Sequence, residues 1–136
     1  MDNMQDSLTG PPCGNGDAIS WTLVLTLNPQ KVERWQNLLQ DIVSEVEANE
    51  PGTLNYQWSI SEDKKSAQVY ERYANAESAI KHMANFAKKF GTPFFDPVVT
   101  KHLLVYGDPG EEVRNHIKEY HPKYQSPVMG LNRDLG

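Results

Sequence analysis

Two side chains in this sequence could carry acid–base chemistry, His82 and Glu71. Imidazole has an ordinary pKa close to neutral pH, so His82 is the natural candidate for a general base. Glu71 alternates with Val69 and Tyr73, which places all three on one face of a strand. Burial on that face would raise the pKa of Glu71 and make it a second catalytic candidate. The alternative is a structural ion pair or hydrogen bond.

Aromatic side chains accompany these two residues. Tyr56 and Trp58 share one face of a strand, and Phe86 and Phe90 share the apolar face of a helix. On that helix His82 lies roughly 40° around the axis from Phe86, at the edge of the apolar stripe. These rings could line an apolar cavity between sheet and helices, or they could form an ordinary core that His82 merely borders. The candidate substrate-binding residues are Tyr56, Trp58, Tyr73, Phe86 and Phe90.

The elements that must position these residues follow from apolar periodicity. Alternation predicts strands, and apolar spacings of three and four predict helices. Asn28 followed by Pro29 is typical of a helix start, and Asn75 can cap a second helix that Gly91 and Pro93 are expected to end. The sequence predicts strands over residues 20–28, 53–61, 66–74 and 98–106, and helices over residues 29–48 and 76–90.

The order of these elements, βαββαβ, predicts an α+β fold of the ferredoxin-like type. Right-handed crossovers give a four-stranded antiparallel sheet with both helices on one face. The other face would carry Val24, Tyr70 and Leu104 or their neighbours, with Gln57 or Arg72 beside them. Such a mixed apolar surface is expected to be covered by a second sheet, most simply in a two-fold homodimer.

Three segments divide the chain. Residues 1–18, rich in glycine and proline, are expected to form a flexible arm, and residues 19–107 the folded domain. Residues 108–136 are expected to form a C-terminal extension that begins with a short amphipathic helix. His116, in this extension, belongs to no motif. Cys13 is the only cysteine, so it has no disulfide partner within the chain, and no Cys/His spacing indicates a metal site.

Composition excludes several classes of function. The chain of 136 residues has a net charge of −5 and no run of more than two basic residues, which argues against nucleic acid or anionic membranes as partners. RNA-recognition modules share the βαββαβ order, but residues 66–74 lack their basic-glycine-aromatic consensus. No apolar segment approaches the roughly 18 residues that a membrane span needs, and the start lacks the features of a signal peptide. A cytoplasmic protein is the expectation.

Two motifs resemble those of the antibiotic biosynthesis monooxygenase family. The first is Glu-Pro-Gly-Thr-Leu at residues 50–54, followed by Tyr56. The second is Tyr-Glu-Arg-Tyr at residues 70–73, with His82 nine residues after its last tyrosine. The resemblance covers about residues 18–107. It implies a dimeric α+β barrel, in which two sheets face each other with the helices outside.

The resemblance also implies functional residues. The family's recurrent histidine falls on His82, its strand tyrosines on Tyr56 and Tyr73, and its glutamate on Glu71. Haem-degrading relatives have an iron-ligating histidine about ten residues further along, whereas residues 89–92 contain none. Haem is therefore not expected.

The function that the resemblance implies is cofactor-independent monooxygenation. The substrate would be a quinol or polycyclic phenol, oxidised by dioxygen in an apolar cavity, with His82 and Glu71 as catalytic groups and no cofactor or metal. The alternative is a binding protein that holds a hydrophobic small molecule or fatty acid without chemistry. A structural dimer without a ligand is a third possibility.

Overall fold

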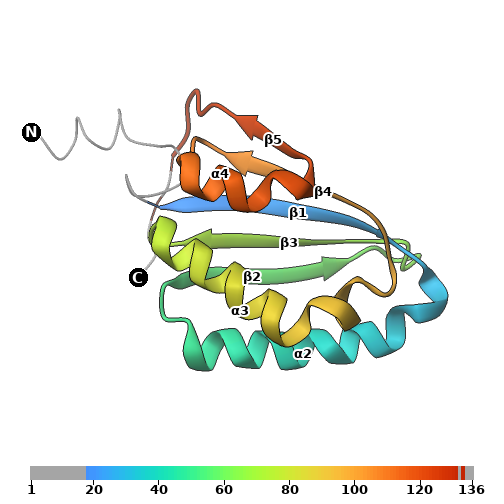
Figure 1. Cartoon of the computed structure of the whole chain (residues 1–136). Helices are drawn as coiled ribbons and strands as arrows, with labels where there is room; N and C mark the ends of the chain where they lie inside the picture. Colours follow the sequence, from blue (N-terminus) through green and yellow to red (C-terminus); the bar gives the residue numbers. More distant parts are fainter. Residues whose placement is uncertain (1–17, 132, 134–136) are drawn as a thin grey trace, which may run out of the picture.

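The computed structural model describes residues 18–131 and 133. Over this part of the chain, strands form a single sheet, and helices α2, α3 and α4 lie on one side of it (Figure 1). The strands are β1 (Ile19–Leu27), β2 (Thr53–Ile60), β3 (Ser66–Tyr73), β4 (Val98–Tyr106) and β5 (Pro122–Gln125). The helical segments are η1 (Pro29–Lys31), α2 (Val32–Asn49), α3 (Ala76–Phe95), α4 (Glu111–Ile117) and η2 (Lys118–Tyr120).

The predicted α+β ferredoxin-like arrangement is confirmed, but the prediction of four antiparallel strands is wrong. The sheet has five strands in the order β2-β3-β1-β4-β5, and β5 runs parallel to β4. Pro122, which has no N–H to donate, stands at the first position of this edge strand, where the loss is tolerated. The N–H of Gly107 donates to the carbonyl oxygen of Gln125 at 2.7 Å. A strand of four residues is too short to show alternation, so β5 could not be predicted from the apolar pattern.

The core lies between the sheet and the helices. Trp21, Leu23, Leu25 and Leu27 alternate along β1 and are all buried on the helix-covered face. Leu54 of β2 has the two-residue spacing of Tyr56 and Trp58, which share one face of that strand, but it is 44% exposed. The register between β2 and β3 shifts at this residue, and such a bulge turns its side chain away from the core.

Helix α3 continues past the point where it was expected to end. Pro93 lies inside the helix, which stops only at Phe95. The reason is tertiary packing around Phe94, which is 1% exposed. Its ring lies 5.7 Å from that of Trp35, and the Trp35 Nε1–H donates to the Phe94 carbonyl oxygen at 3.0 Å. This burial outweighs the helix-breaking tendency of proline.

A pair of glycine substitutions tests the packing that positions the turn between α2 and β2. A Cβ on Gly52 would lie 2.7 Å from the Cβ of Ser78, whereas a Cβ on Gly91 in α3 meets nothing within 4 Å. Gly52→Ala is expected to lower the free energy of unfolding by about 1–3 kcal/mol through overpacking. Gly91→Ala is expected to raise it by about 0.5–1 kcal/mol through helix propensity. Urea denaturation measures both, and equal effects of the two would contradict the predicted clash.

Candidate active site

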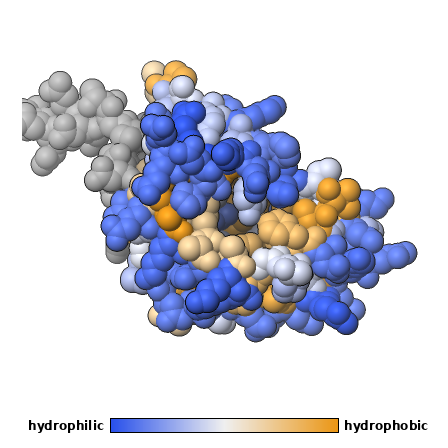
Figure 2. Space-filling view, viewed as in Figure 1, coloured by the Kyte–Doolittle hydropathy of each residue, from blue (hydrophilic) through white to orange (hydrophobic). Residues whose placement is uncertain are grey.

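A cavity of about 320 Å³ lies between the sheet and the helical layer. Its floor is apolar, formed by the buried residues Trp21, Leu23, Phe94, Leu103 and Ile117. The four lining residues that are exposed come from α3 and from α4 with η2, so the cavity opens between these elements. They are Ala84, Ala87, His116 and Glu119. Figure 2 shows a hollow on this side of the molecule with hydrophobic side chains around it.

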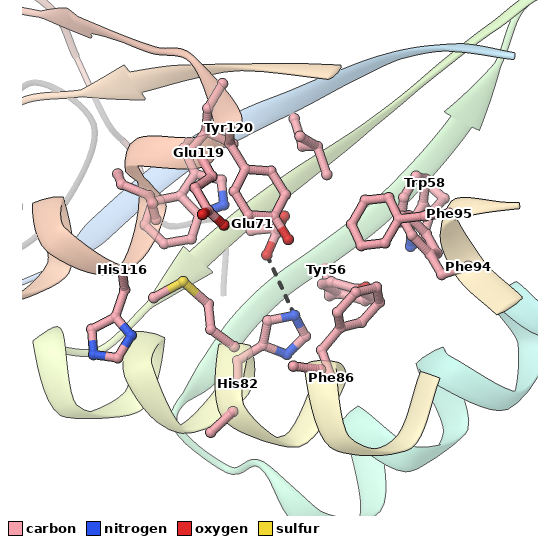
Figure 3. A pocket seen from close by; sticks show the side chains of 17 residues that line it. Tyr56, Trp58, Glu71, His82, Phe86, Phe94, Phe95, His116, Glu119 and Tyr120 are labelled. Atoms are coloured by element: carbon pink, nitrogen blue, oxygen red, sulfur yellow. Dashed lines mark ion pairs between the residues drawn. The ribbon is translucent and has the colours of Figure 1, made fainter. Parts of the chain in front are cut away.

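A histidine between two carboxylates forms the polar part of the site. The His82 Nδ1 lies 2.7 Å from Oε1 of Glu50, and its Nε2 lies 3.5 Å from Oε1 of Glu71. The hydroxyl of Tyr73 donates a hydrogen bond to the same Glu71 oxygen. His82 and Glu71 line the cavity (Figure 3). Glu50 and Tyr73 contact these two residues but are not part of the lining. Each of the two carboxylates and the histidine is only about 5% exposed.

Glu50 is fixed by the turn that carries it. It follows the last residue of α2, and its N–H donates to the Val46 carbonyl oxygen at 2.9 Å. Its side chain accepts hydrogen bonds from the Thr53 hydroxyl at 3.0 Å and from the Asn85 amide at 3.5 Å. A carboxylate held by this many donors is suited to orient an imidazole and fix which ring nitrogen faces the cavity.

Burial and charge set the protonation of the three groups. Burial alone would lower the pKa of His82, but the hydrogen bond to Glu50 and the charges of Glu71 and Glu50 outweigh it, so this pKa is raised. Burial likewise opposes ionisation of Glu50, yet the hydrogen bond and charge of His82 lower its pKa. Burial raises the pKa of Glu71, and the opposing effects of His82 and Tyr73 do not cancel it. An imidazolium held by an ionised Glu50 therefore faces Glu71, the carboxylate best able to accept a proton.

The structure brings most of the predicted site residues together. Tyr56, Trp58 and Phe86 line the cavity beside His82, and the Tyr56 and His82 rings are 5.0 Å apart. Burial raises the pKa of Tyr56 well above its usual value, so it remains a phenol rather than a base.

Two predicted substrate-binding residues lie outside the cavity lining. Tyr73 packs against His82, with their ring centroids 5.5 Å apart, and its hydroxyl donates a hydrogen bond to Glu71. Phe90 lies one helical turn beyond Phe86, at a centroid distance of 6.5 Å, and packs against the core.

Sequence reasoning missed four polar residues of the site. Glu50 was predicted only as part of a turn motif, because a glutamate beside a Pro-Gly turn does not indicate a histidine partner 32 residues away. His116, Glu119 and Tyr120 of the C-terminal extension also line the cavity. Their contribution depends on how α4 and η2 pack across α3, and no local pattern in the sequence reveals that packing.

NMR titration of His82 tests the arrangement of the three groups. The pKa of His82 is expected above its ordinary value of about 6.5 and is expected to fall in Glu50→Gln, which removes a negative charge and keeps the shape. The His82→Gln variant, which lacks the signal, assigns it. An unchanged pKa in Glu50→Gln would contradict the ion pair.

The same pKa shifts set how stability depends on pH. Because the folded-state pKa of His82 is raised, its contribution is fully present below about pH 6.5 and is lost as the pH rises through the folded-state value. The raised pKa of Glu71 acts in the same direction. The free energy of unfolding is therefore expected to fall from neutral to alkaline pH, and to fall less steeply in Glu50→Gln. Chemical denaturation at a series of pH values measures this slope.

Two further features of the described residues bear on function. None of the helices there is both long and apolar enough to cross a membrane. No group of three or more His, Cys, Asp and Glu side chains, within residues 18–131 and 133, is arranged to hold a metal ion.

Fold and site together define a small ferredoxin-like α+β protein with an internal apolar cavity and an acid–base cluster on its wall. The family model for antibiotic biosynthesis monooxygenase matches residues 21–89, and the chain belongs to this family. A comparison with curated proteins finds no match.

Several solved structures share the fold. MupZ from Pseudomonas fluorescens superposes with a TM-score of 0.75 at 16% identity, over 86% of this chain and 95% of that one. A mutant of SnoaB, a cofactor-independent oxygenase from Streptomyces nogalater, gives a TM-score of 0.56 at 11% identity, over 70% and 96%. A conserved protein from Methanosarcina mazei superposes with a TM-score of 0.59 at 17% identity, over 66% of this chain and 91% of that one. At these identities the likeness concerns the fold.

Proposed function

We propose that this protein is a cofactor-independent monooxygenase that oxidises a quinol or polycyclic phenol with dioxygen. The family to which it belongs includes cofactor-independent oxygenases such as SnoaB. The observation that carries the proposal is the buried carboxylate of Glu71, paired with His82 on the wall of an apolar cavity. This pairing gives a proton acceptor in a place from which bulk water is excluded.

The first step is proton transfer from the substrate hydroxyl to Glu71. The positive charge of His82, held in place by Glu50, stabilises the substrate anion that remains. The resulting electron-rich anion passes one electron to dioxygen, and the substrate radical and superoxide combine at a ring carbon to give a peroxide. Loss of water then leaves a quinone carbonyl. For a naphthol, naphthol plus O₂ gives naphthoquinone plus H₂O, so one oxygen atom enters the product and the other leaves as water.

Oxygen uptake tests the proposal. Purified protein, treated with a chelator, is mixed with 1-naphthol, 1,4-dihydroxynaphthalene or anthrone, and the consumption of dioxygen is compared with the uncatalysed rate. Uptake above that rate, with one ¹⁸O atom from ¹⁸O₂ in the 1-naphthol product, is the expected result. Uptake no faster than that without protein, for all three compounds, would reject the proposal.

A binding protein for a hydrophobic small molecule or fatty acid is the second candidate. The observation that favours it is the largely apolar lining, which would hold such a ligand without any chemistry. Tight binding of an apolar ligand together with no oxygen uptake would support this function over the first.

We also propose that two copies associate through the sheet face opposite the helices. Val24, Tyr70 and Leu104 are half-buried on that face, and the Nε of Arg72 has no hydrogen-bond partner among the described residues. A second sheet would cover this apolar surface. Sedimentation equilibrium is expected to give the mass of a dimer, and Leu104→Lys is expected to shift it toward the monomer.

A further inference from the structure

The C-terminal extension supplies one wall of the cavity. Ile117, Glu119 and Tyr120 line it from α4 and η2, and all three lie beyond residues 21–89, the part matched by the family model. Figure 3 shows Tyr120 across the cavity from His82. A ligand that binds beside His82 therefore contacts this wall on the opposite side of the cavity.

Tyr120 is held in position by its neighbours. Its ring centroid lies 6.2 Å from that of Phe95, and the Lys101 ammonium lies 5.3 Å from the Phe95 centroid and 5.7 Å from the Tyr120 centroid. One cation thus contacts two aromatic rings, an arrangement that restrains both of them. The Tyr120 side chain is a fixed boundary of the cavity rather than a freely moving one.

The segment that carries Tyr120 is anchored on both sides. Before it, Val113 and Ile117 of α4 are buried in the core, with 0% and 1% exposed. After it, β5 pairs with β4, and the Arg114 guanidinium stacks 3.7 Å above the ring of Tyr124. Because both flanks are packed, the wall cannot retreat without breaking core contacts or a strand pairing.

The volume of the cavity then limits the ligand. An apolar cavity of about 150 Å³ holds one benzene ring, and each fused ring adds only about half the volume of benzene, so a cavity of about 320 Å³ has room for about three fused rings. We infer that Tyr120 is a specificity-determining residue that restricts the substrate to a hydroxylated aromatic of at most three fused rings. As a statement about substrates this rests on the proposed function, whereas the size limit itself can be tested by binding alone.

Binding of two probes tests the limit. Each additional ring normally tightens the binding of an aromatic ligand, because it adds apolar area to be buried. With a fixed wall a fourth ring no longer fits, and the protein is expected to bind 2-anthrol at least about tenfold more tightly than the four-ring 6-hydroxychrysene. Quenching of the fluorescence of Trp21 and Trp58, which line the cavity, reports binding without turnover.

Substitution of Tyr120 tests whether this side chain sets the size limit on the ligand. Tyr120→Ala is expected to improve the affinity for 6-hydroxychrysene relative to 2-anthrol by at least about tenfold, whereas Tyr120→Phe, which keeps the ring, retains the original order. If Tyr120→Ala fails to fold in a thermal melt, Tyr120→Leu shortens the side chain while keeping apolar packing, and the same gain is expected. Tighter binding of 6-hydroxychrysene by the unaltered protein, or an unchanged order in the folded shortened variant, would overturn the inference.

The outcomes also separate this inference from the proposed function. A preserved size order without oxygen uptake would reject the oxygenase and leave the wall in place. Oxygen uptake that occurs equally well with three-ring and four-ring phenols would reject the wall and leave the oxygenase.

Discussion

Replacement of Glu71 by glutamine is expected to lower the turnover of naphthol or quinol substrates by about 100- to 10,000-fold, the usual contribution of a general base. Glutamine keeps the size of the side chain and can still accept the hydrogen bond from Tyr73, but it cannot take up the substrate proton. The expected loss is therefore in kcat, with ligand affinity little changed. Oxygen uptake measures the first quantity and tryptophan quenching the second.

The dependence on pH and a matched variant sharpen this test. Because the base must be ionised, kcat is expected to rise as the pH rises through the raised pKa of Glu71, and this rise should vanish in Glu71→Gln. Glu45→Gln is the control, since this α2 carboxylate pairs with Lys89 outside the cavity lining. Full turnover by Glu71→Gln would remove this carboxylate from the mechanism and return the role of base to His82.

Local signals predicted the helices well because they act within a few residues. Asn75 caps α3, with its side chain accepting from the Ser78 N–H at 2.9 Å, and Asn28 accepts from the Gln30 N–H at 3.1 Å. These bonds depend on side-chain chemistry and short spacing alone. The alternation in β3 placed Glu71 on one face with Val69 and Tyr73 for the same reason, and all three are buried.

Contacts between distant segments decided what the sequence could not predict. Glu50 and His82 are 32 residues apart, and each alone is an ordinary residue at the end or edge of a helix. The extension of α3 through Pro93 depends on the fit of Phe94 against Trp35. The fifth strand forms because the short segment β5 pairs with β4, and this pairing also helps to hold the wall around Tyr120. The candidate site thus depends on contacts between distant residues, which no periodic pattern in the sequence predicts.

The second large effect is expected on stability, from Glu50→Ala. This change leaves the buried His82 without the carboxylate on its Nδ1, and also removes the acceptor of the Thr53 hydroxyl bond. Breaking a buried ion pair from one side typically costs 3–5 kcal/mol, so a loss of about 3 kcal/mol in the free energy of unfolding is expected. Urea denaturation at pH 6, where His82 is protonated, measures it.

A double substitution shows whether this loss belongs to the pair. In Glu50→Leu with His82→Phe, both partners of the 2.7 Å pair are replaced by apolar groups. Glu71 then loses its cationic neighbour, but its raised pKa lets it become protonated, so part of the lost stability should return. The two single variants complete a thermodynamic cycle whose coupling energy is expected to exceed about 1 kcal/mol, as for residues in direct contact. Additive effects of the two changes would show that Glu50 and His82 do not stabilise each other. Glu50 would then have no role in orienting the imidazole toward Glu71.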